Sequence, residues 1–166
     1  FSVIYEQTSG ETDVSVKAKD KVFECLDVKN DDGMLVLKLN LKDGKSYTLP
    51  PIEVKVRTKH LTYVELSGSG SFTCEKGIKT ESKTATAIIR GAGKITLGGK
   101  TGNATYKLNG VGVIDAESLK ADNVRSDRAG IGSIGISPTA NQLTNFSYAW
   151  PLSLFSHVNE PGGRSV

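Results

Sequence analysis

Apolar and polar residues alternate with a period of two through much of residues 1–60. Leucines occupy every second position of the segment 35–41, and Ile52, Val54 and Val56 alternate with charged side chains. This alternation places apolar side chains on one face of a β-strand and polar side chains on the other. No long segment shows the apolar spacing of an amphipathic helix. The pattern predicts about five short strands in residues 1–60.

Turn-forming residues separate these strands. The run Asn30-Asp31-Asp32-Gly33 and the pair Asp43-Gly44 supply positions that tolerate a left-handed backbone, as tight reversals require. We therefore expect a hairpin around residues 28–42. The pair Pro50-Pro51 cannot donate hydrogen bonds to a sheet, so it marks a strand boundary.

A Gly-x-Gly motif recurs four times in the second half of the chain. The first glycines of the four motifs stand 23, 19 and 20 residues apart, and an aromatic residue or isoleucine always follows two residues after the second glycine. A fixed period near 20 residues indicates stacked supersecondary units. Glycine-rich hairpins of an antiparallel sandwich are the alternative, but the repeated register favours a solenoid. The eight glycines are Gly68, Gly70, Gly91, Gly93, Gly110, Gly112, Gly130 and Gly132.

We interpret these glycines as structural turn residues at the corners of the coils, where positive φ is expected. Strands that leave each corner would stack about 4.8 Å apart and bury one apolar column. By the same argument Gly110 should tolerate substitution less well than Gly99, which is expected in a looser loop. The predicted organisation is one β-solenoid domain over residues 1–166, with N-terminal strands in 1–60, repeat coils in 61–145 and a C-terminal cap or tail in 146–166.

Several of these segments together resemble a known family. They are the Ser-Gly-Ser-Gly-Ser run at 67–71, Gly-Ala-Gly-Lys-Ile at 91–95, the segment 115–121, Gly-Ile-Gly-Ser-Ile at 130–134 and the strand at 50–56. Over about residues 12–140 the chain resembles the head GIN domain of autotransporter adhesins, a family common in Bacteroidetes. The resemblance implies an all-β, right-handed parallel β-helix-like fold, similar to pectin-lyase-type solenoids without their catalytic residues. It also implies an exported protein, periplasmic, associated with the outer membrane or at the cell surface.

Charge and hydropathy exclude some partners. The chain has 166 residues and a net charge of +3, from 21 Lys and Arg against 18 Asp and Glu. The charges are interspersed, and no basic patch with interleaved aromatics indicates a nucleic-acid site. No run of 18 apolar residues predicts a transmembrane segment. The first residues lack the basic region of a signal peptide, so a signal or lipoprotein sequence would have to lie in a precursor.

No cofactor or metal site is predicted. The segment 130–135 matches G-x-G-x-x-G, but a dinucleotide site needs a helix after it, and Pro138 follows instead. His60 and His157 lie in dissimilar segments, and Cys25 and Cys74 lack the spacing of a zinc site. Whether the two cysteines pair stays open, because a disulfide depends on compartment and geometry.

The acidic residues of the repeat do not indicate catalysis. They fall at different positions of the repeat, so stacking would not gather them into a ladder, and they are Glu65, Glu75, Glu81, Asp115, Glu117, Asp122 and Asp127. We therefore expect a module that is not an enzyme and that binds a protein or glycan at the cell surface, as an oligomer or a monomer. The alternative is a polysaccharide lyase or hydrolase on a pectin-lyase-like scaffold, with distant residues converging on one groove.

An aromatic segment ends the chain. Phe146, Tyr148 and Trp150 lie on one face at period two. A cap over the open end of the solenoid is the leading interpretation, because stacked folds need covered ends. A subunit interface and a sugar-stacking platform are the alternatives. A cap would bury Trp150 in the monomer.

Overall fold

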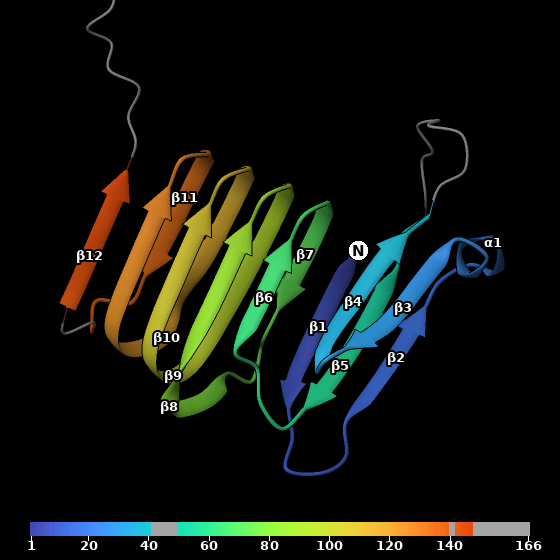
Figure 1. The fold of residues 1–166 in the computed structure, drawn as a ribbon, viewed down its shortest axis with the longest axis horizontal. Helices are drawn as coiled ribbons and strands as arrows, with labels where there is room; N and C mark the ends of the chain where they lie inside the picture. Colours follow the sequence, from blue (N-terminus) through green and yellow to red (C-terminus); the bar gives the residue numbers. More distant parts are fainter. Residues whose placement is uncertain (41–49, 140–141, 148–166) are drawn as a thin grey trace, which may run out of the picture.

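The computed structural model describes residues 1–40, 50–139 and 142–147, and this part of the chain is built almost wholly of strands (Figure 1). The first half holds one short helical turn, α1 (Asp20–Phe23), and five strands. These are β1 (Ser2–Gln7), β2 (Asp13–Lys17), β3 (Leu26–Asp31), β4 (Met34–Leu39) and β5 (Glu53–Thr58). The prediction of about five short strands from period-two alternation is confirmed.

The second half is a β-solenoid of about four turns. Its strands are β6 (Tyr63–Leu66), β7 (Ser69–Thr73), β8 (Ile78–Ile89), β9 (Ala92–Leu108), β10 (Val111–Arg128), β11 (Ile131–Ile136) and β12 (Gln142–Ser147). Each strand pairs in parallel with the equivalent strand of the next coil. Parallel pairing of consecutive coils confirms the solenoid and excludes the antiparallel sandwich.

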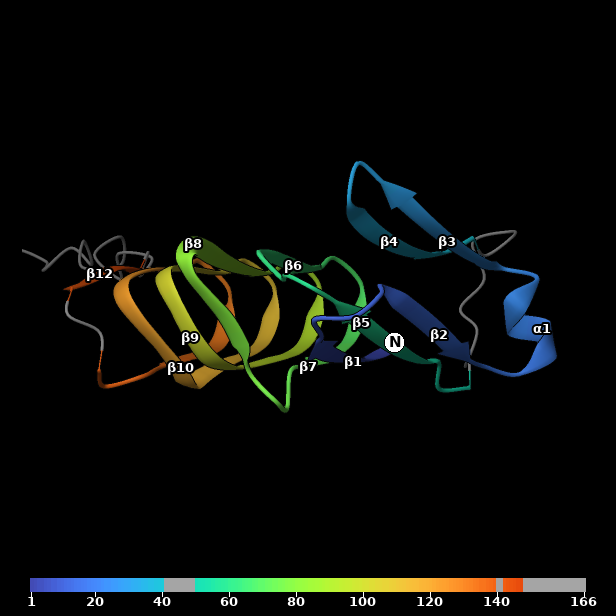
Figure 2. The same cartoon turned by 90° about the horizontal axis from the view of Figure 1, so that it is seen from below.

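Interruptions in the register divide each coil into three sides. The first side is formed by β7, the start of β9, the start of β10 and β11. The second side is formed by residues 78–80, 98–101 and 118–121. The third side is formed by β6, the ends of β8, β9 and β10, and β12. Figure 2 shows the coils from below, wrapped around a common interior.

An apolar column runs through the interior of the first side. Its members stand in register from coil to coil and are Val54, Val3, Phe72, Ile95, Ile114 and Ile134. Ile95 and Ile114 are fully buried. Burying such a side chain contributes about 1.5–3 kcal/mol relative to leaving it exposed, so one apolar residue per coil at this position accounts for much of the cohesion between coils.

The N-terminal strands extend the same sheet in a different chain order. Strand β1 lies between β5 and β7 and is parallel to both, and β2 pairs antiparallel with β5 at the end of the sheet. The hairpin β3–β4 forms a separate two-stranded sheet. It lies over β1, β5 and β2, on the same side of the molecule as β6 and β8 (Figure 2).

The hairpin appears where the turn residues predicted it. Asp32 and Gly33 have φ of 47° and 79°, as a two-residue turn with a left-handed backbone requires, and the Asn30 side chain accepts a hydrogen bond from the Gly33 amide at 3.1 Å. The alternating leucines of β4 face inward and pack against the core, whereas Val36 and Lys38 are exposed. The period-two pattern thus gave the correct inner face of β4.

The glycine repeat serves close stacking of coils. The first glycine of each motif lies in a bend and the second lies within a strand. A Cβ added at Gly112 would overlap the carbonyl oxygen of Gly93 in the coil below, and one at Gly132 would overlap that of Gly112. Coils could not approach this closely with any side chain there. Close approach of backbones, rather than the turn alone, therefore explains why the motif has two glycines.

The structural basis of the expected contrast between Gly110 and Gly99 is wrong. Gly99 lies inside β9 with φ of +107°, and a Cβ there would overlap the carbonyl oxygen of Ile78. Gly110 is not among the positive-φ glycines of the described chain, and a Cβ there would overlap the carbonyl oxygen of Gly91. Both positions therefore exclude side chains, and Gly99 also has a backbone that favours glycine.

Candidate functional site

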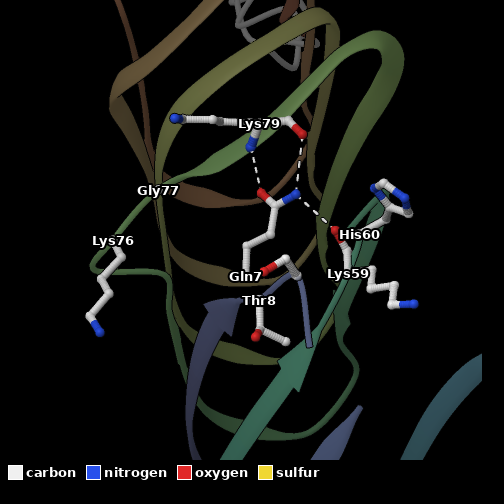
Figure 3. Close-up of a pocket in the computed structure, with 8 residues that line it drawn as sticks. Gln7, Thr8, Lys59, His60, Lys76, Gly77 and Lys79 are labelled. Carbon is white, nitrogen blue, oxygen red and sulfur yellow. Dashed lines mark hydrogen bonds between the residues drawn. The ribbon is translucent and has the colours of Figure 1, made fainter. Parts of the chain in front are cut away.

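A shallow hollow opens where β1 and β5 end and where the chain enters β8 (Figure 3). It has a volume of about 620 Å³. It is lined by Gln7, Thr8, Ser9, Lys59, His60, Lys76, Gly77 and Lys79. The strands of the first side run into this region, and β8 begins the second side beside it. The hollow therefore lies next to the second side, at the end of the solenoid where β8 begins.

Gln7 ties the three segments of the hollow together. Its amide nitrogen donates to the carbonyl oxygens of Lys59 at 2.8 Å and Lys79 at 3.2 Å, and its amide oxygen accepts from the Lys79 backbone N–H at 2.6 Å. Figure 3 shows this side chain in the centre of the hollow, between the three segments. A single amide side chain thus fixes the backbone that carries the surrounding lysines.

The lining of the hollow is basic. Lys76 and Lys79 extend on one flank of Gln7, and Lys59 and His60 extend on the other (Figure 3). Glu6 accepts a hydrogen bond from the Lys76 ammonium at 2.6 Å, and this bond holds the pKa of the Glu6 carboxyl below its usual value. The cations point away from one another, so the hollow offers an extended positive surface and not a single point of convergence.

A second polar cluster lies on β6. The Glu65 carboxylate accepts hydrogen bonds from the Tyr63 hydroxyl, from the Ser67 hydroxyl at 2.7 Å and from Arg90 Nε at 3.0 Å. The Tyr63 bond, followed by the Ser67 bond and the Arg90 charge, lowers the pKa of Glu65. The same Glu65 bond raises the pKa of Tyr63. At neutral pH the pair is held as carboxylate and phenol, which suits a structural clamp and gives neither group a pKa matched to proton transfer.

The sequence and the fold of this chain are both similar to those of known proteins. A family model described as "Putative auto-transporter adhesin, head GIN domain" matches residues 1–143. The chain belongs to this family. The head GIN domain is also similar to a crystal structure of "a putative adhesin" from Bacteroides fragilis NCTC 9343, with 20% identity, a TM-score of 0.64 and coverage of 88% of this chain and 84% of the other. None of the curated proteins compared with the chain matches it.

The head GIN domain keeps its predicted candidate residues apart. His60 lines the hollow, whereas His157 lies outside the described residues. Cys25 and Cys74 are free thiols, and burial raises the pKa of the Cys74 thiol. In the described ranges no three acidic, histidine or cysteine side chains are grouped as a metal site would require. No helix there is long and apolar enough to cross a membrane.

The carboxylates of the coils also lie on different sides. Asp115 is on the first side and pairs with Lys94 at 3.2 Å, Asp127 is on the third side, and Glu65 is held in the β6 cluster. Of the aromatic segment, the backbone of Phe146 is in β12, and Tyr148 and Trp150 lie outside the described residues. The cap, interface and sugar-stacking interpretations therefore stay predictions.

Sequence reasoning missed two features of this region. The β6 cluster has a local signal, because Tyr63 and Glu65 stand at alternate positions of one strand and so share a face, and Ser67 follows in the bend just after it. The hollow has no such signal. Its residues come from the ends of β1 and β5 and from the start of β8, and only the insertion of β1 between β5 and β7 brings them together.

Proposed function

We propose that this head GIN domain is a non-catalytic adhesion or scaffold module that binds a protein or glycan partner at the bacterial surface. The family match over residues 1–143 carries the proposal, because that family is described by adhesion. The Bacteroides fragilis protein of the same fold, also described as an adhesin, agrees with it. The proposed location is outside the cytoplasm, in the periplasm, at the outer membrane or on the cell surface.

The structure supports binding without turnover in two ways. Stacked coils give wide, regular sides whose outward side chains are held by the register of the strands. The Glu65 cluster with Tyr63 and Arg90 is held in the protonation states that oppose acid–base work. A surface of this kind recognises partners through many weak contacts distributed over several coils.

The test is a binding screen of the intact domain on glycan arrays and on immobilised host-matrix proteins. Retention of at least one class of partner without release of products is the expected result. Depolymerisation of uronate or neutral glycans, with or without calcium, would replace the proposal with the polysaccharide-active enzyme. Fractionation of native cells tests the location, and recovery of the protein only in the cytoplasm would contradict export.

A further inference from the structure

The long sheet has two ends, and they differ in what covers them. At the end formed by β11, the Arg128 guanidinium donates to the Gly132 carbonyl oxygen at 3.0 Å, so a side chain of the same chain occupies part of that end. At the other end, β2 pairs with β5 and with no further strand of the described chain. Figure 1 shows β2 as the last strand of the sheet, with α1 beyond its C-terminal end. The outer edge of β2 is therefore without a strand partner in this part of the chain.

The pairing of β5 shows which of its backbone groups face β2. The Ser2 amide donates to the Ile52 carbonyl oxygen at 2.8 Å, and the Thr8 amide donates to the Thr58 carbonyl oxygen at 2.9 Å. Both acceptors have even numbers, and backbone groups of successive residues in a strand point to opposite edges. The even-numbered residues of β5 therefore face β1, and the odd-numbered residues face β2.

The register of β2 then identifies the backbone groups at the outer edge. The odd-numbered residues of β5 stand opposite Asp13, Ser15 and Lys17, so these three residues direct their N–H and C=O groups toward β5. Val14 and Val16 lie between them and direct their backbone groups outward. Each of these two valines offers one donor and one acceptor to a further strand.

The apolar interior is only partly covered at this end of the sheet. Val14 and Val16 are partly buried, whereas the residues opposite them, Val56 and Val54, are buried. Val28 of β3 faces the same interior, because it stands opposite a leucine of β4 that packs against the core, yet it is 42% exposed. A strand added beside β2 would extend the covered interior as well as the sheet.

The side chains of β2 and its flanks are complementary to their own reverse order. Residues 11–19 read Glu-Thr-Asp-Val-Ser-Val-Lys-Ala-Lys. If this segment is laid antiparallel against a second copy with Ser15 at the centre, each acidic residue meets a lysine and each valine meets a valine. The pairs that meet are Asp13 with Lys17, Glu11 with Lys19, and Val14 with Val16.

The same charges oppose other registers. A slip of two residues in one direction places Lys17 opposite Lys17 of the second copy, and a slip in the other direction places Asp13 opposite Asp13. Like charges directly opposite one another destabilise a sheet, whereas opposite charges stabilise it. A slip of one residue would turn the valines to the wrong face. Charges on an edge strand often prevent pairing with other chains, but this arrangement favours one antiparallel register.

We infer that β2 is a dimerisation edge, and that its partner is β2 of a second copy of this chain, paired antiparallel about a two-fold axis at Ser15. Val14 and Val16 of each copy exchange backbone hydrogen bonds with Val16 and Val14 of the other. Asp13 and Lys17 then meet in pairs that are not hydrogen-bonded through the backbone, where opposed side chains lie closest. The interface uses the same surface of both copies, as a two-fold dimer requires.

This dimer would join the long sheets of the two copies into one. The two solenoids would extend in opposite directions from the central pair of β2 strands, with a β11 end at each extremity. Two identical binding surfaces on one rigid body strengthen attachment to a partner that presents repeated sites. The inference goes beyond the proposed adhesion function and does not depend on the identity of the adhesion partner.

The experiment measures self-association of the full chain by sedimentation equilibrium over a range of concentrations. D13K places lysines opposite one another at both central charge pairs of the dimer, and K17D places acidic residues there. Each variant alone should associate at least about fivefold more weakly than the intact domain. An equimolar mixture restores opposite charges at both pairs, so it should form a heterodimer at nearly the strength of the intact dimer.

Matched controls separate the interface from a general effect of charge. K120D and D122K make the same changes in formal charge at exposed residues of β10, and both should dimerise like the intact domain. Melting curves follow folding, because D13K faces Arg57 and K17D faces Glu53 within the same copy. Rescue in the mixture needs two folded partners, so loss of folding cannot imitate it.

A cross-link tests the register without any change of charge. In an S15C/C25S variant the two introduced thiols would lie across the two-fold axis, in a pair whose Cα atoms stand about 4.5 Å apart, within the range of a disulfide. The C25S change removes a thiol that is partly exposed, and Cys74 is buried. Mild oxidation should give a disulfide-linked dimer. S118C/C25S, at an exposed serine of β10, is the control and should stay uncrosslinked.

Four outcomes would overturn the inference. The first is an intact domain that stays monomeric at the highest concentration that it tolerates in solution. The second is a dimer whose strength is the same in D13K, K17D and the intact domain. The third is a mixture of two folded variants that does not restore association. The fourth is equal cross-linking of S15C/C25S and S118C/C25S, which would show random collision in place of a defined interface. The cross-link decides alone if either charge variant does not fold.

Discussion

The coils from β7 onward and the strands before them belong to one sheet, but the relation between chain order and position in the sheet differs between the two regions. In the coils each strand pairs with the strand that follows it by one repeat, so chain order and spatial order agree. In the first half β1 lies between β5 and β7, and Ser2 has its partner Ser71 at a distance of 69 positions in the chain. A repeating sequence is therefore required only in the coils, where strands that lie one repeat apart in the chain also pair with each other in the sheet.

Glycine marks the boundary between the two regions. The column of close approaches passes from Gly132 through Gly112 and Gly93 to Gly70, and a Cβ at Gly70 would meet the carbonyl oxygen of Phe1 at 2.5 Å. Beyond that point, β1 and β5 contain no glycine and pair through residues such as Val3 and Val54. The Gly-x-Gly motif thus occurs in the coils whose backbones approach one another most closely at the corner.

The largest effect is expected at the glycine column. Gly112→Val should destabilise the fold by at least about 5 kcal/mol or prevent folding, because its Cβ would overlap the carbonyl oxygen of Gly93 and both coils must separate. Thermal or chemical unfolding measures the change. Gly68→Val is the matched control: nothing lies within 4 Å of its Cβ position, and its cost should stay within about 0.5 kcal/mol. Similar losses in both variants would contradict the close-approach explanation.

The next effect tests the link between the two regions. Tyr5 of β1 is buried, stacks on Phe72 of β7 with ring centroids 6.0 Å apart, and donates or accepts a bond with Thr58 at 3.0 Å. Tyr5→Ala should cost about 3–5 kcal/mol. Hydrogen exchange should then rise in β1, β5 and β2 more than in β10 and β11. Tyr63→Ala, at a side chain that is 40% exposed, is the control and should leave both regions protected.

Removal of the hydroxyl group from each of two buried tyrosines should give smaller changes in stability, of opposite sign. The Tyr5 hydroxyl has Thr58 as its partner, whereas the Tyr106 hydroxyl, inside the coils, has none among the described residues. Tyr5→Phe should therefore lower stability by about 1 kcal/mol, and Tyr106→Phe should raise it by a similar amount. Denaturant midpoints compare them directly. A loss of stability in Tyr106→Phe would mean that the hydroxyl is satisfied in solution.

The smallest effect concerns pH. The pKa of Glu65 is lowered in the folded chain by Tyr63, Ser67 and Arg90, so its contribution is present above the unfolded pKa of about 4.3 and is lost as pH falls through the lower folded pKa. Because the site is largely open to solvent, the contribution should stay below about 1 kcal/mol. Glu65→Gln should flatten the stability curve between about pH 5 and pH 3. An unchanged curve would show that the cluster adds no stability.

Local patterns predicted the parts of the fold that local residues determine. Period-two alternation indicated the strands, Asp32-Gly33 indicated the hairpin, and the Gly-x-Gly spacing indicated stacked coils. The insertion of β1 has no local signal, because Val3 and Tyr5 would fit any half-buried strand. The alignment of three lysines on neighbouring strands was missed for a related reason. Lys79, Lys100 and Lys120 are not part of the motif, and only the register of the coils aligns them.

The place of β1 has a consequence for how the chain folds. In chain order β1 precedes both of its neighbours, β5 and β7, and the second of these ends only at Thr73. Until β7 is in place, β1 lacks one of its two partners, and its pairing closes a long loop that is slow to form. Each later coil instead finds its template already in place. Strand β1 is therefore secured only after two strands that follow it in the chain.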